Sequence, residues 1–144
     1  MPRKTIIAIA FTALTAVASV PASANDVFLD QFGFFNQAGG AQSGFGNQIG
    51  VYQNGVFNGA VAQQNGNHNT AAIGQEGFNN YGETWQNGHG NAAGVGQFGA
   101  NHNALVTQDG NGNVAAGVQV GNGCTAGVSQ NGGGNVAAFV QTCP

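Results

Sequence analysis

Polar and apolar positions recur along this chain every eleven residues, without an insertion, from residue 31 to residue 141. Each unit reads Q-x-G-x-x-N-x-A-x-x-x, and the position nine residues after the Gln is mostly apolar or small. The positions at +7 and +9, counted from the Gln, lie two residues apart, which is the period of a β-strand. An eleven-residue period is also that of a helical supercoil, but Gly and Asn are poor residues for a helix interior. The pattern therefore predicts one β-strand in each unit.

The alternation of inward and outward side chains must shift once in each unit, because eleven is an odd number. Gly at +2 permits a positive φ and Asn at +5 tolerates turn geometry, so we expect the shift between these two positions. Each unit is then one strand followed by one arc, and two units (22 residues) complete one coil. The sequence thus predicts an all-β fold, a β-solenoid of about five 22-residue coils with two parallel sheets face to face.

The Gln and the Asn of each unit are expected to point inward or into the arc, where a side-chain amide needs hydrogen-bond partners. Stacked coils would let each amide bond to the same amide one coil above and one coil below, as a ladder. The ladder glutamines are Gln31, Gln42, Gln53, Gln64, Gln75, Gln86, Gln97, Gln108, Gln119, Gln130 and Gln141. The ladder asparagines are Asn36, Asn47, Asn58, Asn69, Asn80, Asn91, Asn113 and Asn135, with His102 and Cys124 in the two remaining +5 positions. The arc glycines at +2 are Gly33, Gly44, Gly55, Gly66, Gly77, Gly88, Gly99, Gly110, Gly121 and Gly132.

Residues 1–24 have the features of a secretory signal peptide: two cations at the start, a short apolar stretch, and small residues before the expected cleavage site after Ala24. The apolar stretch is short for a membrane span, and nothing later replaces it, so we expect no spanning segment. The expected organisation is a signal peptide (1–24), a short N-terminal segment (25–30) and a repeat domain (31–144) of ten units with a C-terminal tail (142–144).

Composition narrows the possible functions. Beyond residue 24 the chain has five acids and neither Lys nor Arg, a net charge of −5, so it lacks the cations on which nucleic-acid binding depends. The acids are scattered, which argues against paired acid–base catalysis, and we expect no enzyme activity, no cofactor and no metal site. Low charge with 26 Gly, 19 Asn and 14 Gln favours β-aggregation.

The ends of the repeat are the next concern. Soluble solenoids blunt their terminal coils with charged residues, bulges or a capping helix. Six residues (25–30) and three residues (142–144) leave no room for such a helix, and Asp30 and Pro144 are the only visible blocking residues. Self-similar ends that do not close into a ring generate filaments.

The repeat resembles that of the curlin family, the subunits of curli amyloid fibres of Gram-negative bacteria. The family pattern stands here as Gln64, Gly66, Asn69, Ala71 and Gln75, and it recurs from Gln86 and from Gln130. The resemblance implies a secreted, extracellular, cell-surface fibre in which the chain forms a cross-β homo-polymer that supports adhesion and biofilm. It also implies growth from a nucleator subunit and export through an outer-membrane curli secretion channel.

The chain departs from the family pattern in three ways. Curlins usually carry the motif once per coil, whereas this chain repeats it in both arcs. They usually have a Gly-rich export segment before the first repeat, and they usually lack cysteine. We favour the major fibre subunit. The alternatives are a minor nucleating subunit, or a monomeric β-solenoid binding module for polysaccharide or another surface. A solenoid hydrolase would need clustered acids.

Three groups of side chains stand outside the repeat motif. Cys143 is expected to stack over Gly121, across the same arc from Cys124, so an intramolecular disulfide is plausible, with free or intermolecular thiols as the alternative. His68, His89 and His102 are expected to be water-exposed turn residues, with weak metal binding by His68 and His89 as the alternative. The N-terminal aromatic residues favour equally a docking surface or simple packing: Phe28, Phe32, Phe34, Phe35, Phe45, Tyr52 and Phe57.

Overall fold

The computed structural model describes residues 24–144, which form eleven β-strands and no helix. The predicted signal peptide, apart from Ala24, lies outside the described residues. The strands are β1 (Asp26–Phe34), β2 (Gln37–Ser43), β3 (Gln48–Val56), β4 (Gly59–Asn67), β5 (Thr70–Phe78), β6 (Tyr81–His89), β7 (Ala92–Ala100), β8 (Asn103–Asn111), β9 (Val114–Asn122), β10 (Thr125–Gly133) and β11 (Val136–Cys143).

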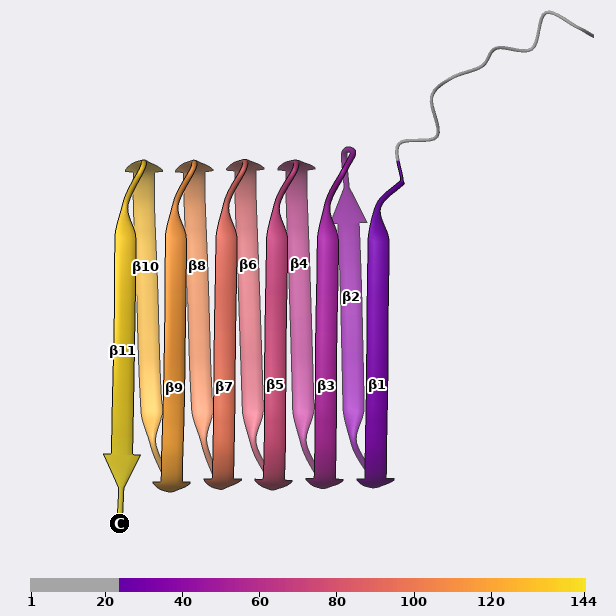
Figure 1. The fold of residues 1–144 in the computed structure, drawn as a ribbon, viewed down its shortest axis with the longest axis vertical. Helices are drawn as coiled ribbons and strands as arrows, with labels where there is room; N and C mark the ends of the chain where they lie inside the picture. The colour runs from indigo at the N-terminus through magenta and orange to yellow at the C-terminus, as the bar shows by residue number, and fades with distance from the viewer. Residues whose placement is uncertain (1–23) are drawn as a thin grey trace, which may run out of the picture.

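The strands alternate between two parallel sheets. The odd-numbered strands form a six-stranded sheet in the order β1-β3-β5-β7-β9-β11, and the even-numbered strands form a five-stranded sheet from β2 to β10. Figure 1 shows the first sheet in front of the second, with β1 and β11 at opposite ends of the body. Each residue pairs with the one 22 positions later, as Gln53 does with Gln75. The predicted β-solenoid of about five 22-residue coils is confirmed.

The space between the sheets is filled by the residues at +7, +9 and the next Gln. In β4, for example, Ala60, Ala62 and Gln64 are buried, whereas Val61 and Gln63 between them face outward. The core is thin because most of its apolar side chains are Ala, Val or Ile. It consists of two apolar clusters, one built on β3, β4 and β5 and one on β7, β8 and β9. Between them, β6 places Gly82 and Thr84 inward.

The arcs change direction through two residues with positive φ. The Gly at +2 has φ between 101° and 131° in all ten units, and the residue at +4 has φ between 54° and 74°. This pair lies in the segment where the shift of alternation was expected. The conformation at +4 was not anticipated, because five of its ten residues are not glycine: Phe35, Phe57, His68, Asn79 and Asn101.

The strand boundaries differ from the expected domain limits at both ends. β1 begins at Asp26, so residues 26–30 are the first half of a strand rather than a separate segment, and β11 includes residues 142 and 143 of the expected tail. The physical reason is that Asn25, Val27 and Leu29 occupy the +5, +7 and +9 phases of a preceding half unit. Asn25 Oδ1 accepts a bond from the Asn47 backbone N–H at 3.0 Å, as the later asparagines do one coil further on.

A search of the described residues for a helix long and apolar enough to cross a membrane found none.

The first testable prediction concerns Thr84. Its Oγ1 is the one buried side-chain polar atom without a hydrogen-bond partner in residues 24–144, and it lies between the two apolar clusters. Val stands at the equivalent positions 106 and 128 of the same sheet. Thr84→Val removes an unpaired hydroxyl and joins the clusters, so it should stabilise the fold by about 1 kcal/mol. The measurement is the denaturant midpoint of the β-sheet circular-dichroism signal.

The control is Thr70→Val, which makes the same change at an exposed outward position of β5. We expect no more than a small shift there. An equal stabilisation by both variants would show that β-propensity, rather than the buried hydroxyl, is responsible.

Candidate functional site

The side chains expected to carry function are the stacked amides. In each sheet, every ladder Gln donates from Nε2 to Oε1 of the Gln 22 residues later, over nine bonds of 2.6–3.0 Å. Gln53, Gln75, Gln86 and Gln97 are among the most deeply buried side chains of the molecule. The glutamines therefore form two continuous columns along the solenoid, one for each sheet.

The second N–H of each Gln side chain bonds to the backbone. From Gln42 onward, each Nε2 donates to the carbonyl oxygen 16 residues earlier, at 2.8–3.2 Å. That carbonyl belongs to the first residue of a strand in the facing sheet, as with Gln53 and Gln37. Each Gln thus ties its own coil both to the next coil and to the opposite sheet. The buried amides are paired, which avoids a cost of about 1–3 kcal/mol for each unpaired group.

The asparagines stack in two columns as well, but they bond differently from the expectation. Each Oδ1 accepts from the backbone N–H of the +5 residue one coil later at 3.0–3.1 Å. Each Nδ2 donates to the carbonyl of the arc Gly 19 residues later at 2.8–3.1 Å. Amide-to-amide bonds occur only in the terminal pairs, from Asn58 to Asn36 and from Asn135 to Asn113. Asn is one methylene shorter than Gln, and it meets the arc backbone before it meets the next amide.

The arc glycines are required by the close approach of successive arcs. A Cβ built on Gly88 would fall on the backbone carbonyl oxygen of Gly110, and the same holds for the other arc glycines that have an arc stacked above them. Gly132, in the last coil, has no such neighbour among the described residues. Both the positive φ and the lack of space therefore exclude side chains at +2.

His102 is buried, which corrects the expectation that it faces water. It stands in an Asn column and reproduces the bonds of an Asn: Nδ1 accepts from the Cys124 backbone N–H at 3.1 Å, and Nε2 lies 3.2 Å from the Phe98 carbonyl. These partners require the neutral ring with its proton on Nε2, because Nδ1 accepts and the carbonyl can only accept. His68 and His89 are exposed, as expected. The described residues contain no group of three or more potential metal ligands.

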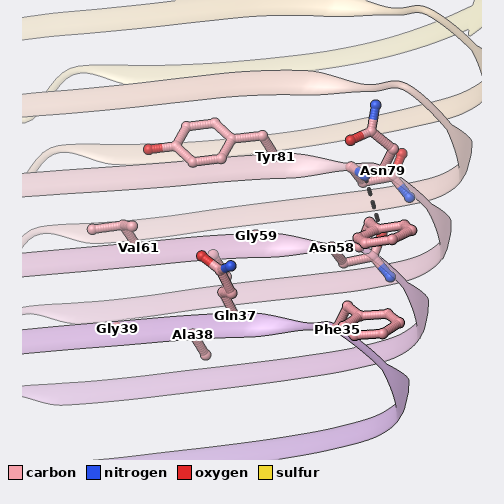
Figure 2. A pocket seen from close by; sticks show the side chains of 12 residues that line it. Phe35, Gln37, Ala38, Gly39, Asn58, Gly59, Val61, Asn79 and Tyr81 are labelled. Atoms are coloured by element: carbon pink, nitrogen blue, oxygen red, sulfur yellow. Dashed lines mark hydrogen bonds between the residues drawn. The ribbon is translucent and has the colours of Figure 1, made fainter.

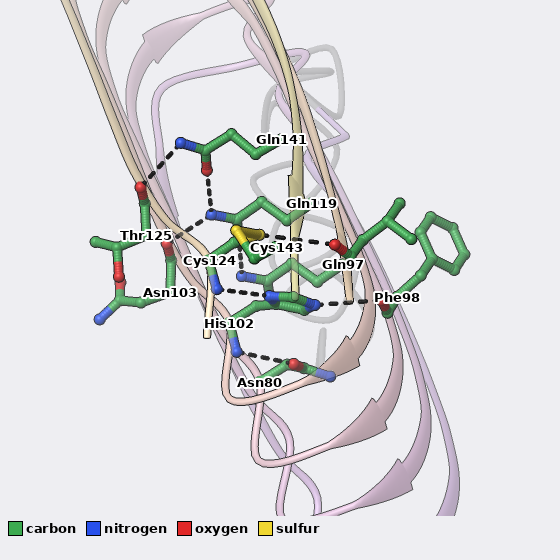
Figure 3. The surroundings of a disulfide bond; sticks show 11 residues. Asn80, Gln97, Phe98, His102, Asn103, Gln119, Cys124, Thr125, Gln141 and Cys143 are labelled. Carbon is green, nitrogen blue, oxygen red and sulfur yellow. Dashed lines mark hydrogen bonds between the residues drawn. A yellow bond between two sulfur atoms is a disulfide. The ribbon is translucent and has the colours of Figure 1, made fainter. Parts of the chain in front are cut away.

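A disulfide joins Cys124 to Cys143, with Cα atoms 5.6 Å apart (Figure 3). Cys124 stands at +5 in the Asn column and Cys143 stands at the +2 position of the last unit. Their separation of 19 residues equals that of each Asn–Gly bond, so the disulfide replaces this bond at the C-terminal end. Figure 3 shows it directly above His102 and beside the end of the Gln column.

The aromatic residues of the N-terminal coils lie on the outer surface. Phe35 and Phe57 stack with ring centroids 5.0 Å apart, and Phe57 meets Phe78 edge-on at 5.8 Å. Phe35 is 72 % exposed and Phe57 51 %. The two rings form one side of a shallow open groove over β2, β4 and β6, which Tyr81 closes on the far side (Figure 2). Burial, followed by the hydrogen bond and charge of Glu83, raises the pKa of the Tyr81 phenol.

The two ends of the ladders are complementary. Within residues 24–144, Oε1 of Gln31 and of Gln42 accepts no hydrogen bond. At the other end, Nε2 of Gln130 and of Gln141 donates only to a backbone carbonyl, which leaves one N–H of each without a partner. The N-terminal end therefore presents acceptors and the C-terminal end presents donors.

These features define a class of protein: a structural β-solenoid held together by side-chain and backbone ladders, with unpaired strands at both ends. The model of the curlin associated repeat matches residues 22–55, 46–77 and 77–110. The chain belongs to the curlin family, whose repeats mark curli-type amyloid subunits and whose fold is structural rather than enzymatic. A search of the curated proteins found no match.

The second prediction tests the close approach of the arcs. Gly88→Ala places a Cβ against the Gly110 carbonyl at a residue with φ of 121°. We expect it to destabilise the solenoid by about 2 kcal/mol or more, since both strain and steric contact oppose it. Gly94→Ala is the matched control, because Gly94 lies on β7 with open space around its Cβ position. The denaturant midpoints of the two variants decide the matter, and similar values would contradict the argument.

Proposed function

We propose that this chain is the major subunit of a secreted, extracellular curli-like amyloid fibre that supports surface adhesion and biofilm. The proposal rests on one observation: the two ends of the solenoid carry unpaired strands and complementary ladder groups, acceptors at β1 and β2 and donors at β10 and β11. Because neither end satisfies itself, a second copy of the chain is the partner that fits both.

The mechanism is templated end-on addition. An incoming chain pairs its backbone with an exposed terminal strand and extends the Gln and Asn columns by one coil at a time. The driving force is the same as within the chain, since each added coil pairs buried amides and covers the apolar +7 and +9 side chains of the coil below. The end of a fibre thus presents the surface on which the next chain folds.

The cellular partners follow from membership of the family. A nucleator subunit at the cell surface would supply the first template, and an outer-membrane secretion channel would deliver the unfolded chain. The expected signal peptide at residues 1–24 supports export across the inner membrane. The exposed Phe residues of the N-terminal coils supply apolar surface for contact with a substratum.

The third prediction is fibre formation by residues 25–144, the chain after the expected cleavage. After removal of denaturant we expect a lag, then dye-positive fibres with reflections near 4.7 and 10 Å, because stacked strands and facing sheets have these spacings. An amyloid dye, electron microscopy and fibre diffraction provide the measurement, with and without reductant. A stable, dye-negative monomer in both conditions would overturn the proposed function and favour a binding module.

The fourth prediction concerns the ladder at the growing end. Gln42→Ala removes an acceptor and a donor from the exposed end of one Gln column, whereas Gln37→Ala removes an outward-facing, exposed Gln from the same strand. Growth of Gln42→Ala on wild-type seeds should be slower by about tenfold, corresponding to about 1.4 kcal/mol for one lost bond at the addition step. Gln37→Ala should elongate close to the wild-type rate. Equal rates for the two variants would contradict growth through the ladder.

A further inference from the structure

The number of strands determines how two copies can meet. The described chain has six strands in one sheet and five in the other, so β1 and β11 both belong to the six-stranded sheet. At the C-terminal end, β11 stands half a coil above β10. The next vacant strand position of the solenoid is therefore above β10, in the five-stranded sheet, and the one after it is above β11.

We propose that successive copies in the fibre are related by a half-turn about the solenoid axis. In this arrangement β1 of the next copy stacks on β10 and its β2 stacks on β11. The six-stranded sheet of each copy thereby continues the five-stranded sheet of the copy before it. This inference rests on the proposed function and adds to it the geometry of the junction between subunits.

The half-turn completes every column in register. Continuing the 22-residue pairing places Gln31 of the next copy above Gln130, and Gln42 of the next copy above Gln141. The unpaired Nε2 N–H groups of Gln130 and Gln141 then meet Oε1 atoms that accept no bond within residues 24–144. Nε2 of the incoming Gln31, which lacks the backbone partner that Gln42 has in its own chain, comes to the carbonyl of Val136. The junction therefore repeats the bonds found inside the solenoid.

The arcs meet equally well. Gly132 has open space where every earlier arc glycine in its column has a carbonyl above it, and the half-turn brings Gly33 of the next copy to that place. Asn135 Oδ1, which accepts no bond in the described chain, meets the backbone N–H of Asn36, the first of its column without an Asn below it.

The inward side chains at the junction are complementary in size. Phe139 is the largest +9 residue, and its ring occupies the place that a Cβ on Gly117 would take in the strand below. In the half-turn arrangement the residue above Phe139 is Gly40 of the next copy. Phe139 is then flanked by glycine on both sides, and Val128 of β10 meets Leu29. The bulkiest +9 side chain thus falls where its neighbours leave most room.

An arrangement without rotation leaves a gap. If β1 of the next copy stacked on β11, its β2 would stand two strand positions above β10, and one position of the five-stranded sheet would stay empty. A strand-wide space of about 4.8 Å would leave both neighbouring strands without backbone partners. Phe139 would also face Leu29 instead of a glycine.

A half-turn requires the two halves of each coil to be interchangeable. The chain meets this condition because the Gln, Gly and Asn motif is repeated in both arcs, and the bonds of the two Gln columns have the same partners and lengths. A solenoid with the motif in only one arc would bring unlike arcs together at such a junction.

The experiment uses pairs of introduced cysteines on outward positions, in residues 25–144 with the native disulfide formed first. Asp30→Cys with Ser129→Cys places the two thiols side by side only in the half-turn arrangement. Asp30→Cys with Val140→Cys does so only without rotation. Asp30 and its partners lie at opposite ends of one chain, so a bond between them must join two copies.

We expect fibres of the first pair, mildly oxidised, to yield a ladder of reducible multimers in a denaturing gel, at about ten times the yield of the second pair, because only directly paired Cα atoms fall within disulfide range. Each single-cysteine variant is the control for random oxidation. Fibres that cross-link through the second pair, or through neither, overturn the half-turn but leave the proposed fibre function standing. A chain that forms no fibres in unmodified form overturns both.

The unmodified fibre provides a measurement that does not depend on the variants. Eleven half-coils at about 4.8 Å per coil give a rise of about 26 Å per subunit, with a rotation near 180° before the twist of the fibre is added. The arrangement without rotation needs six full coil positions, about 29 Å. Helical reconstruction from electron cryomicroscopy distinguishes the two, and a rise near 29 Å without the half-turn would refute the inference.

Discussion

The pairing of each buried Gln amide with the same amide one coil later is the interaction on which the rest of the structure depends. Nine such bonds, together with the bonds from Nε2 to the facing sheet, leave no ladder amide in the interior of the solenoid without partners. A slip of one residue between coils would turn every inward side chain outward and separate the amides, so the register is strongly specified. A thin core of Ala, Val and Ile can fold in one register because the amides penalise every other.

Much of this architecture was predictable from residue spacing, because an uninterrupted period places like residues in one column. The strands, the two sheets, the coil length and the inward positions all followed from the Gln, Ala and +9 residues. Three features did not. The +4 residues are as different as Phe35, His68 and Gly90, so sequence gave no sign of their shared positive φ. The bonding of Asn depends on the distance from a short side chain to the arc backbone, which a repeat pattern does not contain. The half unit from Asn25 was overlooked because no Gln precedes it, although its Asn, Val and Leu were in phase.

The two exceptions in the Asn columns show what that position must do. His102 keeps both functions in one ring, since one nitrogen accepts the N–H of the next coil and the other bonds to the Phe98 carbonyl. Cys124 keeps only the tie to the following arc, and a covalent bond replaces the hydrogen bond there. Both replacements are buried in the column that ends at the disulfide. The position therefore tolerates different chemistry where the connection between coils is preserved.

The place of the disulfide has a consequence for assembly. β11 has a strand neighbour on one side only, so it is the element most prone to fray at the C-terminal end. The bond from Cys124 to Cys143 fastens the end of β11 to the arc that precedes β10. It closes a loop of about twenty residues, which the chain-entropy model values at about 3 kcal/mol. A terminal strand held in its folded position offers the next copy an ordered template, and the incoming chain then bears the ordering cost of its own residues alone.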